Sequence, residues 1–63
     1  MILEIFEYSD RQYIHYEGYS FDLSNGVTMS NGKCYLSIDS YRTLIISPTD
    51  NPQYVDATIS FNH

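Results

Sequence analysis

The sequence predicts an all-β fold, a small, strongly twisted antiparallel meander of about five to seven short strands that closes into a barrel or sandwich, with at most one short helix. Three observations support this fold. Apolar and polar residues alternate with a period of two in several segments. Loops rich in Asn, Gly, Ser and Asp separate those segments. Seven tyrosines and three phenylalanines favour strands and supply apolar surface for a core.

The chain is predicted to be a single domain, residues 1–63, because it contains no linker, low-complexity tract or long repeat. This length is near the lower limit at which a chain buries enough apolar surface to fold without disulfides, metal or a partner. A second copy or a partner protein would therefore add stability.

The N-terminal segments ILEIFEY (2–8) and QYIHYE (12–17) read as two strands joined by a hairpin at Ser9, Asp10 and Arg11. The isoleucines, phenylalanine and tyrosine in residues 2–8 favour sheet. A helical stripe over the same residues is the alternative. Glu4 lies between apolar neighbours, so the inward face of this strand is ambiguous.

The stretch LSNGVTMSNGKC (23–34) contains Ser-Asn-Gly twice. Asn-Gly between strand-like residues predicts a type I′ hairpin turn, because both central positions of that turn need positive φ. We expect turns at Asn25–Gly26 and Asn31–Gly32, with residues 27–30 as a short strand shared by both hairpins. This arrangement is the middle of a β-meander.

The segments on either side of these turns alternate as strands with one wet face. Before the first turn the alternating residues of one face are Tyr19, Phe21 and Leu23, and after the second they are Cys34, Leu36 and Ile38.

The C-terminal third predicts two more strands. The run TLIIS (43–47) is typical of a central strand buried on both faces, and PTDNPQ (48–53) is a loop by composition. Residues 55–62 alternate most regularly, with the apolar residues Val55, Ala57, Ile59 and Phe61 separated by polar ones. If closure is incomplete, we expect the first or last strand to be an open edge that invites dimerisation or addition to another protein's sheet.

The single cysteine, Cys34, excludes an internal disulfide and reads as a small apolar core residue. No apolar run reaches about 18 residues and no basic-then-apolar leader is visible, so we expect neither a transmembrane segment nor a signal peptide. A reducing cytoplasm is the expected location, that of a host cell if the chain is phage-encoded.

Chemical motifs are missing from the sequence. His15 and His63 are far apart and lack metal-ligand spacing, so we expect no metal and no cofactor. No nucleophile elbow, phosphate-binding loop or dinucleotide fingerprint occurs. We therefore expect a protein that is not an enzyme.

Charge is the more informative feature. Eight acidic residues stand against three basic ones, giving a net charge of −5. This excess disfavours direct binding to nucleic acid, which needs a basic surface, and disfavours anionic membranes. Residues 1–22 hold five acids and one base, interleaved with aromatic side chains. One end of the sheet is therefore expected to be acidic and aromatic.

This acidic, aromatic end has two interpretations, an ordinary solvated face or a partner-binding surface. Carboxylates along twisted strands can imitate phosphates, so the partner would be a host protein with a basic, nucleic-acid-binding groove. If Ile14 points inward, Tyr13, His15 and Glu17 point outward. The candidate partner-binding residues are Glu4, Glu7, Asp10, Tyr13, His15, Glu17 and Asp22.

In size and composition, the chain resembles the small acidic inhibitors that phages and mobile elements encode against host nucleases, restriction enzymes, CRISPR effectors or polymerases. The resemblance covers no aligned motif. It implies a non-enzymatic inhibitor or modulator. The alternative is a structural or assembly module that self-associates through a strand edge, with a homodimer that tolerates salt as its simplest form.

Overall fold

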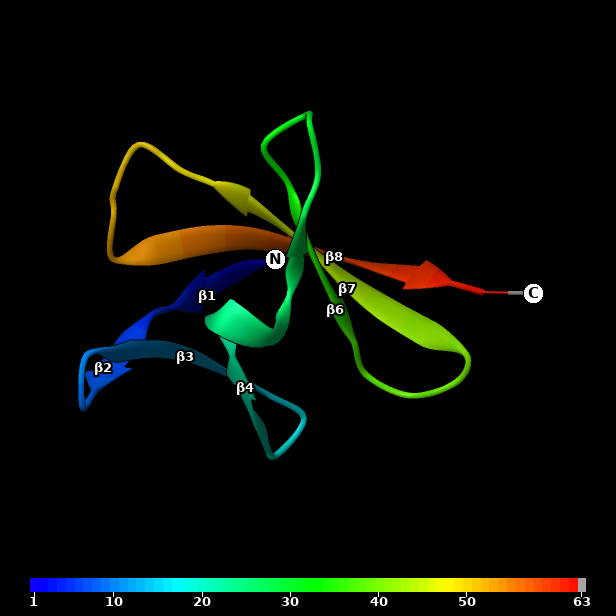
Figure 1. The fold of residues 1–63 in the computed structure, drawn as a ribbon, viewed down its shortest axis with the longest axis horizontal. Coiled ribbons are helices and arrows are strands. Elements are labelled where there is room, and N and C mark those ends of the chain that lie inside the picture. Colours follow the sequence, from blue (N-terminus) through cyan, green and yellow to red (C-terminus); the bar gives the residue numbers. More distant parts are fainter. Residues whose placement is uncertain (63) are drawn as a thin grey trace.

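The computed structural model describes residues 1–62, which form eight strands and one turn of 3₁₀ helix (Figure 1). The elements are β1 (Ile2–Glu4), β2 (Phe6–Tyr8), β3 (Arg11–Tyr16), β4 (Tyr19–Asp22), η1 (Leu23–Asn25), β5 (Val27–Thr28), β6 (Cys34–Ser37), β7 (Arg42–Pro48) and β8 (Tyr54–Phe61). All strand pairs are antiparallel, in a large sheet of order β1-β8-β7-β6-β5 and a small sheet of order β2-β3-β4. The all-β prediction is confirmed.

The strand predicted over residues 2–8 is divided at Ile5, which raises the number of strands to eight. β1 pairs with β8, whereas β2 pairs with β3 in the other sheet. Between them the backbone N–H of Ile5 donates to the carbonyl of Gln53 at 2.8 Å, and its side chain packs against the core. The alternative of a helix here is wrong, since both halves are extended and paired.

Two tight hairpins build the small sheet. Ser9 and Asp10, with φ of 50° and 65°, join the paired residues Tyr8 and Arg11. Glu17 and Gly18, with φ of 51° and 79°, connect β3 to β4 in the same way. Positive φ at both residues of a two-residue loop identifies type I′ turns. The predicted hairpin between the first two segments is therefore confirmed.

The predicted type I′ turn at Asn25–Gly26 is wrong. Asn25 ends η1, and Gly26 is extended, with φ −79° and ψ 159°. Asp22 starts this 3₁₀ turn, since its carboxylate accepts a hydrogen bond from the Ser24 backbone N–H at 2.9 Å. Gly26 is required for space, because a Cβ built on it would collide with Sγ of Cys34. A capping aspartate three residues before Asn-Gly thus diverts the chain out of the small sheet.

At the second Asn-Gly, the hairpin forms but with a different loop. Met29 N–H donates to the Lys33 carbonyl at 2.8 Å, and Gly32 N–H donates to the Met29 carbonyl at 2.9 Å. Gly32 has φ of 82°, while Asn31 is not among the residues with positive φ. This is a three-residue loop closed by a left-handed glycine. β5 pairs with β6 but not with β4, so the predicted meander is interrupted at η1.

β7 is the central strand of the large sheet, as predicted, and lies between β6 and β8. The prediction that it is buried on both faces is wrong, because Leu44 and Ile46 on one face are buried whereas Ile45 on the other is only partly buried. Its last residue, Pro48, lies beyond the end of β6, where no ladder partner needs the N–H that proline lacks. β1 and β5 form the sheet edges, which confirms an edge at the first strand. β8, the last strand, is paired with β1 along only part of its length.

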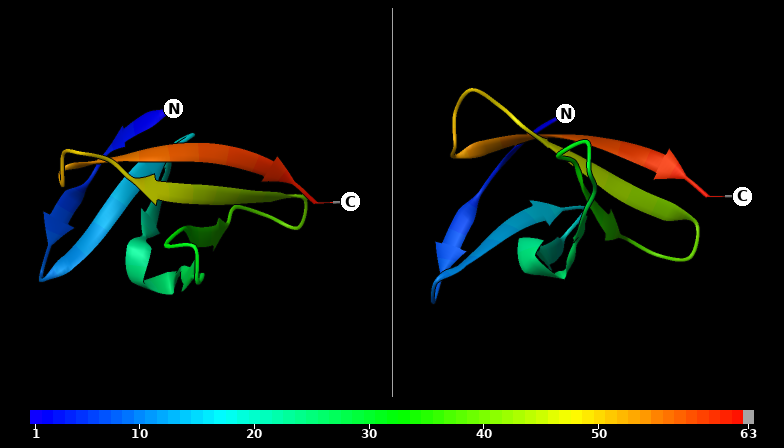
Figure 2. Two further views of the ribbon diagram at one scale, coloured as in Figure 1. Left: turned by 90° about the horizontal axis from the view of Figure 1, so that it is seen from above. Right: turned by 45° about the horizontal axis from the view of Figure 1, so that its top comes forward.

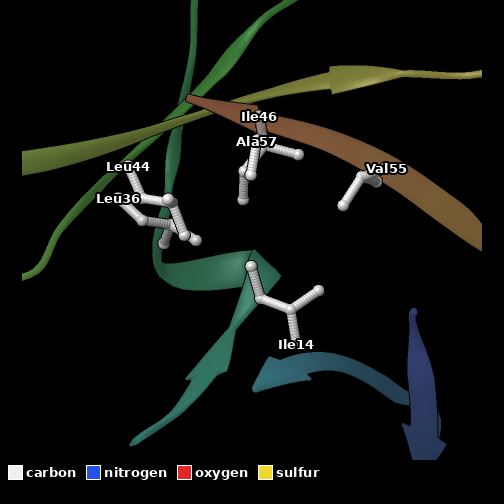
Figure 3. Packing of buried hydrophobic residues seen from close by; sticks show 6 residues of the cluster. All are labelled: Ile14, Leu36, Leu44, Ile46, Val55 and Ala57. Atoms are coloured by element: carbon white, nitrogen blue, oxygen red, sulfur yellow. The ribbon is translucent and has the colours of Figure 1, made fainter. Parts of the chain in front are cut away.

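The core lies between the two sheets (Figure 3). Five of its six buried residues lie on one face of the large sheet, and the sixth, Ile14, comes from β3 and is 0% exposed. Figure 2 shows the small sheet beneath one end of the large one. The two ladders remain separate, and no closed barrel is found in residues 1–62. The buried residues are Ile14, Leu36, Leu44, Ile46, Val55 and Ala57.

We expect Gly26→Ala to lower the free energy of unfolding by about 1–3 kcal/mol, the usual cost of overpacking. The added methyl group would collide with Sγ of Cys34, and Leu36 lies 3.1 Å away. Urea denaturation measures the effect. Cys34→Ala supplies the control, because the double variant should lose less stability than the sum of the two single variants. Strictly additive losses would contradict the close approach.

The left-handed turn at Ser9–Asp10 predicts a gain in stability. Ser9→Asn together with Asp10→Gly should raise the free energy of unfolding by about 1 kcal/mol, because Asn-Gly adopts positive φ more readily. Gly18→Ala is the matched change in the opposite direction, because it removes a glycine from a position with positive φ. A Cβ there meets nothing within 4 Å, so its expected loss is conformational alone. Thermal unfolding that moves both variants in the same direction would contradict this assignment.

Candidate functional site

The small sheet presents an aromatic face on the side opposite Ile14. Strand register places Phe6 beside Tyr13, and alternation places Tyr8 and His15 on the same side. Phe6 is 39% exposed and Tyr8 is 72% exposed. We call Phe6, Tyr8, Tyr13 and His15 the aromatic face. The outward direction predicted for Tyr13 and His15 agrees with this arrangement.

His15 is held in place by its neighbours on this face. Ser20 Oγ lies 2.9 Å from Nδ1 of the imidazole, directly across from it on β4. The ring of Phe6 approaches the imidazole with centroids 4.8 Å apart and planes inclined by 66°. These contacts fix the ring orientation without burying it, an arrangement suited to a preorganised contact residue.

An acidic groove lies at the β2–β3 end of the small sheet. It is open, has a volume of about 540 Å³ and is lined by Glu7, Asp10, Arg11, Gln12, Leu23 and Ser24. Within residues 1–62, neither Glu7 nor Asp10 forms an ion pair. We call this depression the acidic groove. Its two free carboxylates can accept hydrogen bonds from a cationic side chain that enters it.

Asp22 lies across from Tyr13 but is engaged within the chain. Its carboxylate accepts hydrogen bonds from the backbone N–H and the hydroxyl of Ser24, and it forms an ion pair with Arg11 at 3.0 Å. The Ser24 hydroxyl and N–H, together with Arg11, hold the pKa of Asp22 below its usual value. Asp22 therefore starts η1 and neutralises Arg11, which reduces its capacity to bind a partner.

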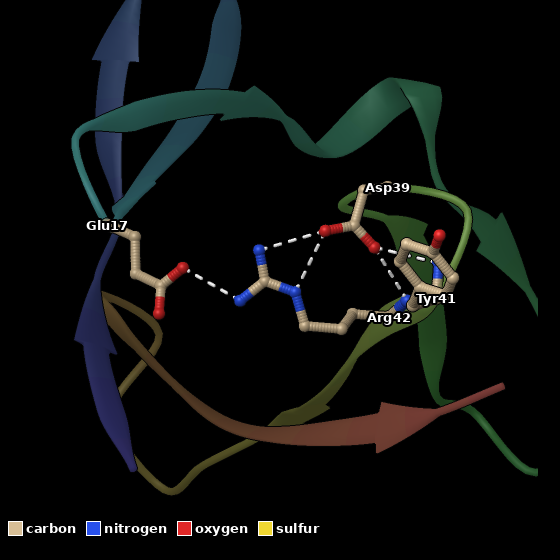
Figure 4. Close-up of polar contacts among 4 residues, drawn as sticks. All are labelled: Glu17, Asp39, Tyr41 and Arg42. Atoms are coloured by element: carbon tan, nitrogen blue, oxygen red, sulfur yellow. Dashed lines mark hydrogen bonds and ion pairs between the residues drawn. The ribbon is translucent and has the colours of Figure 1, made fainter.

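Glu17 is at the opposite end of the small sheet, where it contacts the large one (Figure 4). Its carboxylate accepts a hydrogen bond from Nη1 of Arg42 at 2.9 Å, and the same guanidinium bonds Asp39 at 3.0 Å. These bonds raise the pKa of Arg42. Burial, with the charge of Glu17 next, raises the pKa of Tyr16. Glu17 therefore connects the β3–β4 turn to the β6–β7 loop.

Asp39 organises that loop. It accepts hydrogen bonds from the backbone N–H groups of Tyr41 at 2.8 Å and Arg42 at 2.9 Å. The Tyr41 N–H, followed by the contacts with Arg42, lowers the pKa of Asp39. Ion pairs thus occupy both arginines of the chain.

The seven predicted residues are therefore only partly brought together. Tyr13 and His15 belong to the aromatic face, and Asp22 lies on the same side of the small sheet. Glu7 and Asp10 line the acidic groove at the β2–β3 end of that sheet. Glu17 is bound to Arg42 at the far end. Glu4 is on β1, opposite Tyr54 in the large sheet.

Sequence reasoning missed Phe6 and Tyr8 as surface residues. The information was present, because a two-residue loop at Ser9–Asp10 pairs Tyr8 with Arg11 and therefore Phe6 with Tyr13. The carboxylates that are engaged in ion pairs within the chain were harder to identify from the sequence. Arg11 bonds Asp22 across 11 positions and Arg42 bonds Glu17 across 25 positions, which no local pattern shows. The contact of Arg42 with Asp39, by contrast, is local.

In the described part of the chain, no group of three His, Cys, Asp or Glu side chains is arranged to hold a metal ion. His63 lies outside the described residues. Cys34 packs against the core, and burial raises the pKa of its thiol, so it is protonated at neutral pH. No helix within residues 1–62 has the length and apolar character needed to cross a membrane.

The lowered pKa values of Asp22 and Asp39 predict loss of stability in acid. Their contributions are fully present above the ordinary aspartate pKa of 3.8 and are lost as pH falls through the lower folded-state values. Asp39→Asn should be less stable than wild type at about pH 6, and the difference should shrink towards about pH 2. Urea denaturation across this range measures it.

Asp50→Asn is the matched control, since Asp50 has no side-chain hydrogen bond or ion pair within residues 1–62. At about pH 6 it should lose less stability than Asp39→Asn, because it removes no hydrogen bond or ion pair within residues 1–62. An Asp39→Asn deficit of equal size at both ends of the range would contradict a stabilising role for the Asp39 charge.

Comparison with known proteins gives no relative on which to base a function: no family model, no curated protein and no solved structure matches the chain.

Proposed function

We propose that this chain is a non-enzymatic binding protein that places its small sheet against a basic surface of another protein. One observation carries the proposal: the small sheet combines an exposed aromatic face on one side with, at its β2–β3 end, a groove whose two carboxylates lack ion-pair partners within residues 1–62. Exposed aromatic side chains are enriched at interaction hot spots, and carboxylates on the same small sheet supply charge complementary to a basic partner.

The chemistry of these residues favours a partner rich in arginine or lysine. A guanidinium entering the acidic groove would meet Glu7 and Asp10 and form charge-assisted hydrogen bonds. Phe6 and Tyr8 lie on the other side of β2 from Glu7, where an exposed ring would receive a second cation. The net charge of −5 would speed encounter with such a surface.

The support beneath the aromatic face favours a rigid contact surface. Ile14, on the other side of β3, is fully buried against the large sheet, and we infer that the two sheets act as a small sandwich. Because β3 is anchored in this way, the face need not be ordered on binding, which lowers the entropic cost of association.

The partner surface we infer is one that normally holds nucleic acid, because phosphate-binding grooves combine positive charge with an open cleft. Occupation of that groove would exclude nucleic acid, so the chain would act as an inhibitor or modulator of its partner. The binding surface we propose consists of the acidic groove and the aromatic face, and is smaller than the one formed by the seven predicted residues. Glu17 and Asp22 serve the fold, through Arg42 and Arg11.

Affinity capture from bacterial lysate with the tagged chain tests this proposal. We expect a nucleic-acid-binding protein that elutes as salt rises towards about 1 M, where the Debye length falls to about 3 Å. Glu7→Gln with Asp10→Asn should weaken binding of that protein about tenfold or more. Tyr8→Ala should also weaken it, without loss of stability, because the Tyr8 side chain is largely exposed.

Glu4→Gln with Asp50→Asn is the matched control, since it removes the same charge away from the groove. It should retain most of the affinity. Equal weakening by both double variants would indicate non-specific electrostatics and contradict a defined site. Purified chain should also displace nucleic acid from the captured protein, and failure to do so would exclude the inhibitory mechanism.

A further inference from the structure

The second half of β8 is an open strand edge. β1 covers β8 from Tyr54 to Asp56, and two more bonds join Met1 and Ala57: Ala57 N–H donates to the Met1 carbonyl, and the amino group of Met1 donates to the Ala57 carbonyl, each at 2.7 Å. Beyond Ala57, β8 continues with β7 on one side only, as the two views of Figure 2 show. The open stretch is residues 58–62.

The hydrogen-bonding pattern fixes which backbone groups face outward. Asn62 N–H donates to the Tyr41 carbonyl, whereas Ala57 N–H donates to Met1 on the opposite side. Because the direction alternates along an antiparallel strand, Ile59 and Phe61 direct their N–H and C=O groups away from β7. No hydrogen bond within residues 1–62 uses these four groups.

This edge has the chemistry of a contact between identical acidic chains. The sequence TISFN (58–62) carries no charge, in a chain of net charge −5. The other edge strands differ: β1, β2 and β4 each contain a carboxylate, and β5 has only two residues. Phe61 is 65% exposed beside this edge. A second copy would therefore meet the least repulsion here.

We propose that β8 pairs antiparallel with β8 of a second copy about a two-fold axis at Ser60. In this register Ile59 of each copy lies opposite Phe61 of the other copy. The N–H and C=O groups of Ile59 and Phe61 in each chain are therefore all hydrogen-bonded. Ile59 and Phe61 are on the same face of β8, so each exposed Phe61 ring meets an isoleucine across the junction. This pairing is independent of the acidic groove.

The two-fold geometry makes Ser60 diagnostic. Ser60 would lie opposite its own counterpart in a non-hydrogen-bonded pair, where Cα atoms are about 4.5 Å apart. That separation falls within the range of a disulfide. Ser60→Cys should therefore form a covalent dimer under mild oxidation. Thr58→Cys is the matched control, because residue 58 would lie opposite Asn62.

Sedimentation equilibrium tests the non-covalent dimer. Wild type should associate as its concentration rises to about 1 mM, because a contact this small is expected to be weak. Added salt should strengthen it, since salt screens repulsion between the acidic chains. Phe61→Pro removes two of the four intermolecular bonds and no ladder bond, so it should weaken the dimer about 30-fold. Phe61→Val, which keeps the N–H, should weaken it less.

Thermal unfolding of Phe61→Pro shows whether this variant is folded before its dimerisation is compared with that of wild type. A monomeric wild type at every concentration, together with Ser60→Cys oxidising no faster than Thr58→Cys, would overturn the proposal. Dimers that survive Phe61→Pro unchanged would also overturn it, by placing the contact elsewhere. Selective cross-linking of Ser60→Cys would support this register even where the free dimer dissociates on dilution.

Discussion

The burial of Ile14 is the interaction on which the rest of the structure depends. The small sheet contributes this one fully enclosed side chain to a core otherwise built from the large sheet. Residues 1–62 contain one hydrophobic core, so no second core compensates for its loss. Because Ile14 is directed inward, β3 must direct Tyr13 and His15 outward. The contact that closes the core therefore also creates the exposed aromatic face.

The strands were predictable where the information was local. Alternation located β4, β6 and β8, and the apolar run identified β7 as central. What could not be read locally was the assignment of strands to sheets. Ile5 divides one extended segment because its neighbour is Gln53, and Gly26 is needed because Cys34 packs against its backbone. Both constraints come from residues distant in the sequence.

The outward orientation of the side chains at the candidate site was predictable, but which of its carboxylates remain outside ion pairs was not. Period-two reasoning correctly placed Tyr13 and His15 on one side of β3. A count of carboxylates, however, treats every acid as free, whereas the fold pairs Asp22 with Arg11 and Glu17 with Arg42. The acids available to a partner are therefore fewer than the net charge suggests, and their distribution follows from long-range contacts.

The pairing of the first strand with the last constrains the order of folding. Met1 and Asp56 are 55 positions apart and lie in contact, so β1 cannot dock until almost the whole chain is present. Local hairpins, such as β2–β3, can form early at little cost in loop-closure entropy. Val55 and Ala57, which complete the core, lie in β8 itself. During synthesis the apolar face of the preceding strands therefore stays uncovered, and a native core forms only when β8 has emerged.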